Sequence, residues 1–173
     1  MKVLSLVLSA LALVTTLESQ ARSMLPERPL LQLKTDDVNN VRTSNFRYGA
    51  MTVTVTNYGT LEVDSIGGGR KSKTLAPENF SLIKHYVLRL SNAETKTTRL
   101  PVVCMAMPNG YRDGLAIARN FRDERSLPGV LRPVWEESGC MYSQTVNFVE
   151  ESANEQAEQL VLIVRVLALE ALN

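Results

Sequence analysis

The stretch Ala50–Tyr58, AMTVTVTNY, decides the fold class of this chain. Its apolar residues Met51, Val53 and Val55 alternate with threonines, and a period of two in mostly β-branched residues is typical of a strand with one buried face. The turn sequence Asn57-Tyr58-Gly59 follows, and apolar residues alternate again beyond it. The sequence therefore predicts a β-hairpin here.

Three further segments carry strand-like patterns: Leu82–Leu90 (LIKHYVLRL), Arg99–Met107 (RLPVVCMAM) and Tyr142–Phe148. Together with the hairpin they predict a mainly β fold of about six to eight strands. We expect a single-domain antiparallel β-sandwich, or a barrel-like sheet, with at most short helices.

The C-terminal segment carries two conflicting signals. Ser152 to Glu155 matches a helix capping box, and good helix formers follow it. Leu160–Val166 (LVLIVRV), in contrast, is a continuous apolar run rich in β-branched residues, which is typical of a strand buried on both faces. We favour a strand over residues 160–167, paired in a hairpin with Gln144–Val149, and a helix is the alternative for residues 160–172.

The first 21 residues have the three parts of a secretory signal peptide. Lys2 supplies positive charge, Val3–Leu17 is apolar, and Ser19-Gln20-Ala21 is a small-x-small cleavage site. The apolar run is shorter than the about 20 residues that span a bilayer, so we expect cleavage after Ala21 and no membrane span. The mature chain is then secreted and extracellular. An uncleaved anchor or a buried N-terminal helix is the alternative.

We expect two parts in the chain after the leader. Residues 22–45 form an extended N-terminal segment, in which Pro26 and Pro29 disfavour an early helix. Leu31 and Leu33 could add a short edge strand there, and a removed pro-segment is a second possibility for residues 22–45. Residues 46–173 form a single β-rich domain.

The near-neutral charge of the chain bears on which class of partner it binds. The formal net charge is +1, and removal of the predicted leader leaves it unchanged because the leader holds one base and one acid. Such a near-neutral chain argues against a nucleic-acid binder that relies on bulk charge. With 45% hydrophobic residues, the chain can bury a core.

The two cysteines, Cys104 and Cys140, both fall in the predicted mature chain. An oxidising compartment and an even count predict one intramolecular disulfide between them. Closing a loop of that length is worth about 3–4 kcal/mol if the entropy comes from the unfolded chain. Two buried free thiols, or a bridge to another chain, are the alternatives.

The segment closed by this predicted bridge is the first candidate for a partner-binding site. Gly110–Ser138 is expected to be irregular, with a short helix possible over Leu115–Arg125. Its candidate contact residues are four cations and the only tryptophan of the chain: Arg112, Arg119, Arg122, Arg125 and Trp135. The alternative is a crossover between sheets with Trp135 in the core, because tryptophan is commonly buried.

Two other motifs are informative. The glycine-rich stretch Gly67–Lys73 (GGGRKSK) is not a Walker loop, because Arg70 precedes Lys71 and Ser65 stands where the first glycine belongs. We interpret it as a solvated loop and as the second candidate interaction surface. Asn79-Phe80-Ser81 is the only N-glycosylation sequon, and it predicts a glycan on Asn79.

The residue types of common catalytic and metal sites are scarce. One histidine, His85, and two cysteines that we expect to be oxidised cannot supply a zinc site of the usual His/Cys type. No G-x-S-x-G elbow is present, and the carboxylate doublets Asp123-Glu124 and Glu136-Glu137 are typical of a solvated surface. We therefore predict a protein that is not an enzyme and that uses no cofactor or metal.

These observations favour a secreted, non-enzymatic interaction protein that binds an extracellular protein or glycan through the disulfide-closed loop. An extracellular structural or matrix protein is the alternative, but such chains are typically repetitive, acidic or of low complexity, and this chain is none of these. A small-ligand carrier with a barrel cavity is a third hypothesis.

Overall fold

The computed structural model describes residues 26–37, 50–99, 111–119, 121, 128–138 and 144–173. The elements in these ranges are, in chain order, β1 (Pro29–Asp37), β2 (Met51–Thr56), β3 (Thr60–Ser65), β4 (Gly69–Thr74), α2 (Pro77–Ser91), β5 (Thr95–Arg99), β6 (Tyr111–Ala118), β7 (Leu131–Ser138), β8 (Gln144–Phe148) and α3 (Glu151–Leu172).

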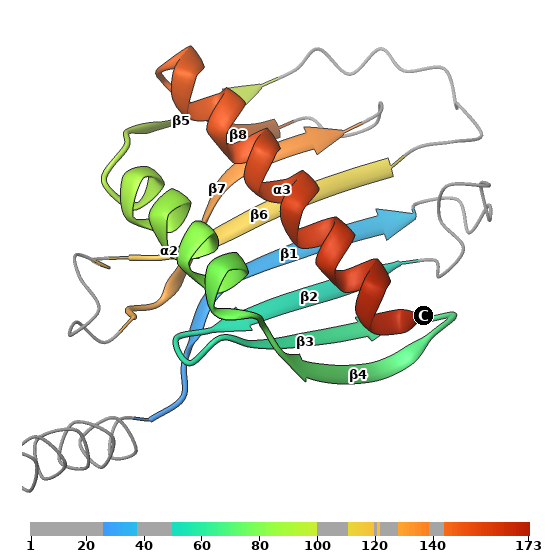
Figure 1. Ribbon diagram of the computed structural model, residues 1–173. Coiled ribbons are helices and arrows are strands. Elements are labelled where there is room, and N and C mark those ends of the chain that lie inside the picture. Colours follow the sequence, from blue (N-terminus) through green and yellow to red (C-terminus); the bar gives the residue numbers. More distant parts are fainter. Residues whose placement is uncertain (1–25, 38–49, 100–110, 120, 122–127, 139–143) are drawn as a thin grey trace, which may run out of the picture.

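Six of these strands form one antiparallel sheet in the order β4-β3-β2-β1-β6-β7, and β5 pairs with β8 in a small second sheet. The predicted mainly β, antiparallel class is therefore confirmed, and the described strands do not close into a barrel. Both helices cover the same face of the six-stranded sheet (Figure 1). The layer that a second sheet fills in a β-sandwich is thus helical here, and with 15 and 22 residues the helices contradict the expectation of short helices at most.

The predicted hairpin is confirmed as β2 and β3. The two strands pair with Val53 opposite Val63, and both side chains are fully buried. Gly59 in the turn has a φ of 81°, and its amide donates to the Thr56 carbonyl over 3.1 Å. A Cβ at Gly59 would lie 3.1 Å from the ring of Phe80, so both the backbone conformation and the packing of α2 favour glycine.

β1 lies in the middle of the sheet, between β2 and β6. Leu31 and Leu33 are fully buried beneath the helices, so the expectation of a short edge strand is wrong. A strand with a neighbour on each side and helices on one face needs apolar residues at every second position, and Leu31 and Leu33 supply them on the buried side.

The solvated loop expected at Gly67–Lys73 is also wrong, because residues 69–74 form the edge strand β4. Backbone pairing to β3, with Lys71 opposite Val63, holds this strand although its side chains are mostly exposed. Lysines are common on edge strands because their charge opposes pairing with other chains.

Leu82–Leu90, predicted as a strand, lies in α2, and that prediction is wrong. Pro77 is in the first turn, where its missing N–H leaves no hydrogen bond unmade. The fully or almost fully buried residues Ile83, Val87 and Leu90 are spaced as on one face of a helix. The same apolar residues also fit an alternating pattern, but that alternation does not correspond to a strand.

The strand predicted over residues 160–167 is also wrong, because this segment lies in α3. This helix buries a stripe against the sheet at helical spacing: Ala153, Ala157, Leu160, Val161, Val164, Leu167 and Ala168. The expected capping box is absent, because the helix begins at Glu151 with Glu150 at its N-cap, and no side chain caps it. The side chain of Asn154 accepts from the Phe148 amide (2.9 Å) and donates to the Phe148 carbonyl (3.1 Å), which links the first turn of α3 to β8. The pairing partner of β8 is β5, not the C-terminal tail.

The segment Gly110–Ser138 is not irregular where the structure describes it, because β6 and β7 are adjacent strands of the main sheet. The short helix predicted from Leu115 is therefore wrong for residues 115–118. Of the predicted strand Arg99–Met107, Arg99 ends β5 and the remainder lies outside the described residues. The strand expected over Tyr142–Phe148 is confirmed from Gln144 onward.

Candidate binding face

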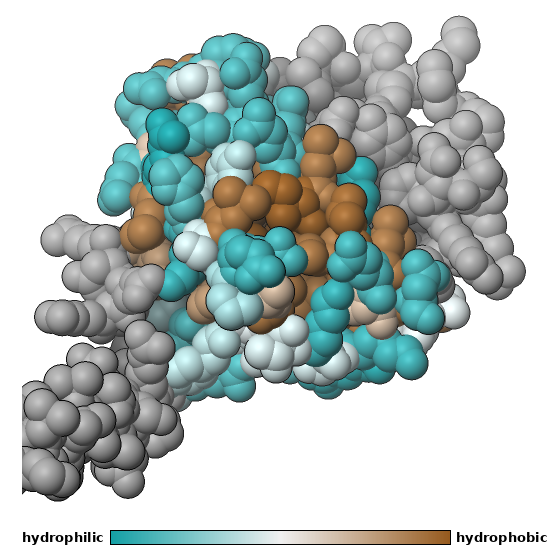
Figure 2. Space-filling model, viewed as in Figure 1, coloured by the Kyte–Doolittle hydropathy of each residue, from teal (hydrophilic) through white to brown (hydrophobic). Residues whose placement is uncertain are grey.

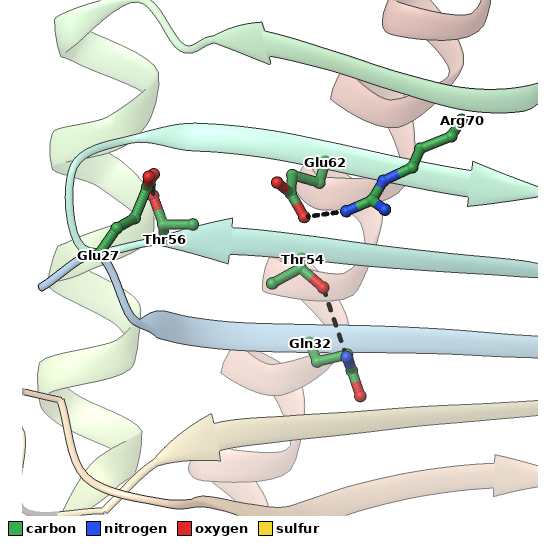
Figure 3. Close-up of polar contacts among 6 residues, drawn as sticks. All are labelled: Glu27, Gln32, Thr54, Thr56, Glu62 and Arg70. Atoms are coloured by element: carbon green, nitrogen blue, oxygen red, sulfur yellow. Dashed lines mark hydrogen bonds and ion pairs between the residues drawn. The ribbon is translucent and has the colours of Figure 1, made fainter.

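The side of the main sheet that faces away from α2 and α3 carries polar side chains. Figure 3 shows this side, with both helices behind the strands. We call it the open face and define it by these residues: Gln32, Lys34, Thr52, Thr54, Glu62, Asp64, Arg70, Ser72, Gly114, Ala116, Pro133 and Glu136. They alternate along each strand with the buried residues of the core, because successive side chains of a strand point to opposite faces.

The cross-strand register arranges the open face in two rows. One row runs through Glu136, Gly114, Lys34, Thr52, Asp64 and Arg70, and the other through Pro133, Ala116, Gln32, Thr54, Glu62 and Ser72. Acidic and basic side chains alternate along the first row, and Arg70 also pairs with Glu62 over 3.3 Å. The mixed signs make this face polar without a single-sign field.

A hollow of about 430 Å³ lies in the open face over β1, β6 and β7. It is lined by Gln32, Lys34, Gly114, Leu115, Ala116, Leu131, Pro133 and Glu136. Gly114 and Ala116 form its floor because they lack long side chains, and a Cβ built at Gly114 would meet no atom within 4 Å. This volume is within the range of about 300–1,000 Å³ that is usual for small-molecule sites.

The rim of the hollow combines groups of different chemistry. Gln32 donates from Nε2 to Thr54 Oγ1 over 3.4 Å (Figure 3), and Lys34 is exposed. On the opposite side, a carboxylate oxygen of Glu136 accepts from the Val146 amide over 3.2 Å, which ties the rim to β8. Leu131 and Pro133 supply an apolar wall. The hollow therefore offers donors, an acceptor and apolar surface within one small volume.

Glu27 lies just before β1, near the turn between β2 and β3. Hydrogen bonds from the hydroxyls of Thr60 and Thr56 lower the pKa of its carboxyl below the ordinary value of 4.5. The bond from Thr56 Oγ1 measures 2.7 Å, and Figure 3 shows the two residues side by side. The carboxylate anchors the entry to β1, and Glu27 is not among the residues that line the hollow.

Of the residues predicted to form the binding loop, those that the structure describes lie along β6 and β7, and not in one irregular loop. Arg112 lies in β6, and Arg119 is exposed directly after it. Trp135 lies in β7 opposite Leu115 and is 4% exposed, so it is a core residue and the alternative interpretation of it is confirmed. Arg122 and Arg125 lie outside the described residues, as do Cys104 and Cys140.

The two remaining sequence motifs fall on α2. Asn79 lies in the first turn of this helix and is half-buried, so the sequon is helical and not in a loop. His85 is exposed on the same helix. Across the part of the chain that the structure describes, no three His, Cys, Asp or Glu side chains gather as a metal site would require. No helix in these ranges is long and apolar enough to cross a membrane.

Sequence reasoning missed the residues that form the hollow. The signal was present in Asp113–Ile117 (DGLAI), where apolar residues alternate with small ones. That pattern predicts a strand with one buried face and one face without large side chains. The expectation of a short helix from Leu115 concealed it.

The chain matches no protein-family model, no curated protein and no solved structure.

Proposed function

We propose that the protein is a secreted, non-enzymatic binding protein whose hollow in the open face holds a sugar residue of an extracellular glycan. The observation that carries the proposal is the hollow of about 430 Å³, with its floor at Gly114 and Ala116. A pyranose ring has apolar C–H faces and hydroxyls that donate and accept hydrogen bonds. The apolar wall at Leu131 and Pro133 suits the ring, and the amide, ammonium and carboxylate groups of the rim suit the hydroxyls.

The extracellular part of the proposal is supported by the sequence. The leader pattern ends in a cleavage site at Ala21, the cysteine count is even, and Asn79 begins a glycosylation sequon. N-terminal sequencing of secreted material should begin at Arg22, and an intact Met1 would contradict secretion by this route.

The binding site of the proposal differs from the loop expected from the sequence. Trp135 is buried in β7 and cannot offer its ring to a partner without unfolding that strand. The open face, in contrast, presents its side chains on rigid strands. Sites on strands hold their geometry better than sites on loops.

The experiment is a glycan array probed with the mature chain, followed by calorimetry on the best glycan. Replacing Gly114 by leucine (Gly114→Leu) should weaken binding about tenfold or more, because the new side chain begins on the lining of the hollow, where a Cβ meets no atom within 4 Å. Ser72→Leu is the matched control, since it adds the same side chain to the same face on β4, away from the hollow. Its affinity should equal that of the unmodified chain.

Two results would overturn the proposal. One is a glycan that binds the Gly114→Leu variant as well as the unmodified chain. The other is a natural partner, captured from extracellular fluid, that binds equally well after enzymatic removal of its glycans. That second result would show that the protein part of the partner, and not its glycans, is bound.

A further inference from the structure

The two sides of the main sheet offer different chemistry to a ligand. On the helix-covered side, apolar surface gathers over part of the molecule (Figure 2), and Leu162 and Val166 of α3 are 58% and 56% exposed. The open face carries polar and charged side chains, and the hollow lies in it. Asn79 belongs to α2, on the helix-covered side, so its predicted glycan would not stand beside the hollow.

The charged side chains of the open face differ in how they are paired. They are Lys34, Glu62, Asp64, Arg70 and Glu136. Arg70 pairs with Glu62 over 3.3 Å (Figure 3), and a carboxylate oxygen of Glu136 accepts from the Val146 amide over 3.2 Å. Among the residues that the structure describes, none forms an ion pair or a hydrogen bond with the ammonium group of Lys34. Lys34 can therefore bind an anion without first breaking a contact.

The position of Lys34 places this cation beside the hollow and away from acidic groups. Lys34 lines the hollow and stands in its row between Gly114 and Thr52, neither of which is charged. The acidic side chains described in the same row, Glu136 and Asp64, begin two strands away on either side, about 9–10 Å from Lys34 between backbones. At physiological salt, charges more than about 8 Å apart are largely screened. An anion in contact with Lys34 is thus attracted more strongly than it is repelled.

The opposite rim of the hollow suits a different part of the same ligand. Glu136 lies across Gly114 from Lys34, and a carboxylate accepts hydrogen bonds from hydroxyl groups. Leu131 and Pro133 give the apolar wall on the β7 side. A sugar ring over Gly114 would therefore direct hydroxyls towards β7 and an anionic group towards β1.

We propose that the sugar residue in the hollow, whose presence there rests on the proposed function, carries an anionic group that binds the ammonium of Lys34. A hexuronic acid and a sulfated hexose share this chemistry, since each has a negative charge at the edge of a pyranose ring. The charge lies over β1, and a ring hydroxyl donates to Glu136 on β7. The unpaired cation selects an anionic sugar over a neutral one, because a hydrogen bond to a charged group is stronger than one between neutral groups.

The test compares oligosaccharides that differ only at C6 of the terminal hexose. This carbon carries a hydroxyl, a carboxylate or a sulfate, in the gluco, galacto and manno series, and calorimetry with the mature chain gives each affinity. At least one anionic form should bind about threefold to tenfold more tightly than its hydroxyl counterpart. Whether the carboxylate or the sulfate shows this preference identifies the source of the charge.

The ratio of anionic to neutral affinity reports on Lys34. Lys34→Met should bring this ratio to about one, and Lys34→Arg should keep most of the preference, because the positive charge remains. Arg70→Met is the matched control, since it removes the other cation of the open face outside the lining of the hollow. It should leave the ratio as in the unmodified chain. Unchanged circular dichroism would show that each variant is folded.

The anionic sugar and the proposed function fail in different ways. If Gly114→Leu weakens the binding of no glycan, the hollow holds no sugar and both proposals are overturned. If the hydroxyl forms bind as tightly as both anionic forms, and Gly114→Leu weakens them all, only the anionic sugar is overturned. A preference that survives Lys34→Met, or one that Arg70→Met abolishes as well, would also overturn it, because Lys34 would then not be the group that selects the charge.

Discussion

Arg165 of α3 donates from Nη2 to Oδ2 of Asp113 in β6, and the two charges form an ion pair between the helix and the sheet. The Asp113 side chain is 3% exposed and that of Arg165 is 27% exposed. Removing a charge from water costs several kcal/mol unless an opposite charge compensates. Thr35, opposite Asp113 in the register, is buried beside it. This pair links α3 to β6, the neighbour of the inner strand β1.

We expect Arg165→Met to lower the free energy of unfolding by about 2–4 kcal/mol, because Asp113 would stay buried without its cation. Arg165→Met combined with Asp113→Leu should recover most of that loss. Arg70→Met is the control, since Arg70 pairs with Glu62 over 3.3 Å in an exposed position, and its cost should be below about 1 kcal/mol. Urea unfolding measures all three. Equal costs for Arg165→Met and Arg70→Met would contradict this account.

Glu27 leads to a prediction about pH. Its pKa is lowered by hydrogen bonds from Thr60 and Thr56, so the folded state holds the charged form more strongly than the unfolded chain does. The stability from this group is fully present above the unfolded value of about 4.5 and is lost as pH falls through the lowered folded value. The effect is small because the carboxylate is exposed.

Carbon-13 NMR titration of the Glu27 carboxyl should give a midpoint below 4.5. Thr60→Val should raise that midpoint, because it removes the larger of the two contributions. A midpoint at or above 4.5 in the unmodified chain would show that these hydrogen bonds are absent in solution.

At the scale of elements, the C-terminal end of α2 is hydrogen-bonded by an arginine side chain from β7. Arg132 of β7 donates from Nη2 to the carbonyls of Ser91 (3.0 Å) and Ala93 (3.1 Å). The last carbonyls of a helix have no hydrogen-bond partner within the helix. A cation near them also interacts favourably with the negative end of the helix dipole. Burial, and secondly the charge of Arg119, lowers the pKa of Arg132, yet a guanidinium stays protonated at neutral pH.

Arg132→Met should therefore lower the free energy of unfolding by about 1–2 kcal/mol and speed hydrogen exchange in the last turn of α2. The matched control is Arg119→Met, which removes an exposed arginine from the turn directly after β6. It should change the free energy of unfolding by less than about 0.5 kcal/mol. If exchange in the last turn of α2 is the same in both variants, Arg132 does not stabilise the end of this helix.

At the scale of the whole molecule, the predicted disulfide joins Cys104, which precedes β6 in the sequence, to Cys140, which follows β7. Replacing both Cys104 and Cys140 with serine should lower the free energy of unfolding by at most about 3–4 kcal/mol. Peptide mapping without reducing agent comes first, and it should recover the two cysteines in one cross-linked peptide pair. A free thiol at either position, or a covalent dimer, would contradict the prediction.

The sequence by itself determined the elements whose pattern is local. The alternation from Met51 to Val55 and the turn at Gly59 specify β2 and β3 without help from other parts of the chain. Its one histidine and two cysteines also led to the prediction that the protein has no zinc site of the usual His/Cys type. Antiparallel β structure was predictable because strand period is a property of a few neighbouring residues.

Only the tertiary structure decided the helices and the candidate site. Leu82–Leu90 and Leu160–Val166 are apolar at so many positions that both a strand and a helix could bury them, and packing against the sheet selected the helix. The central place of β1 depends on pairing with β6, more than 70 positions away in sequence. The hollow depends on the same register, because it sets Gly114 between Lys34 and Glu136. Register between distant strands is set by the whole core, and no short stretch of sequence encodes it.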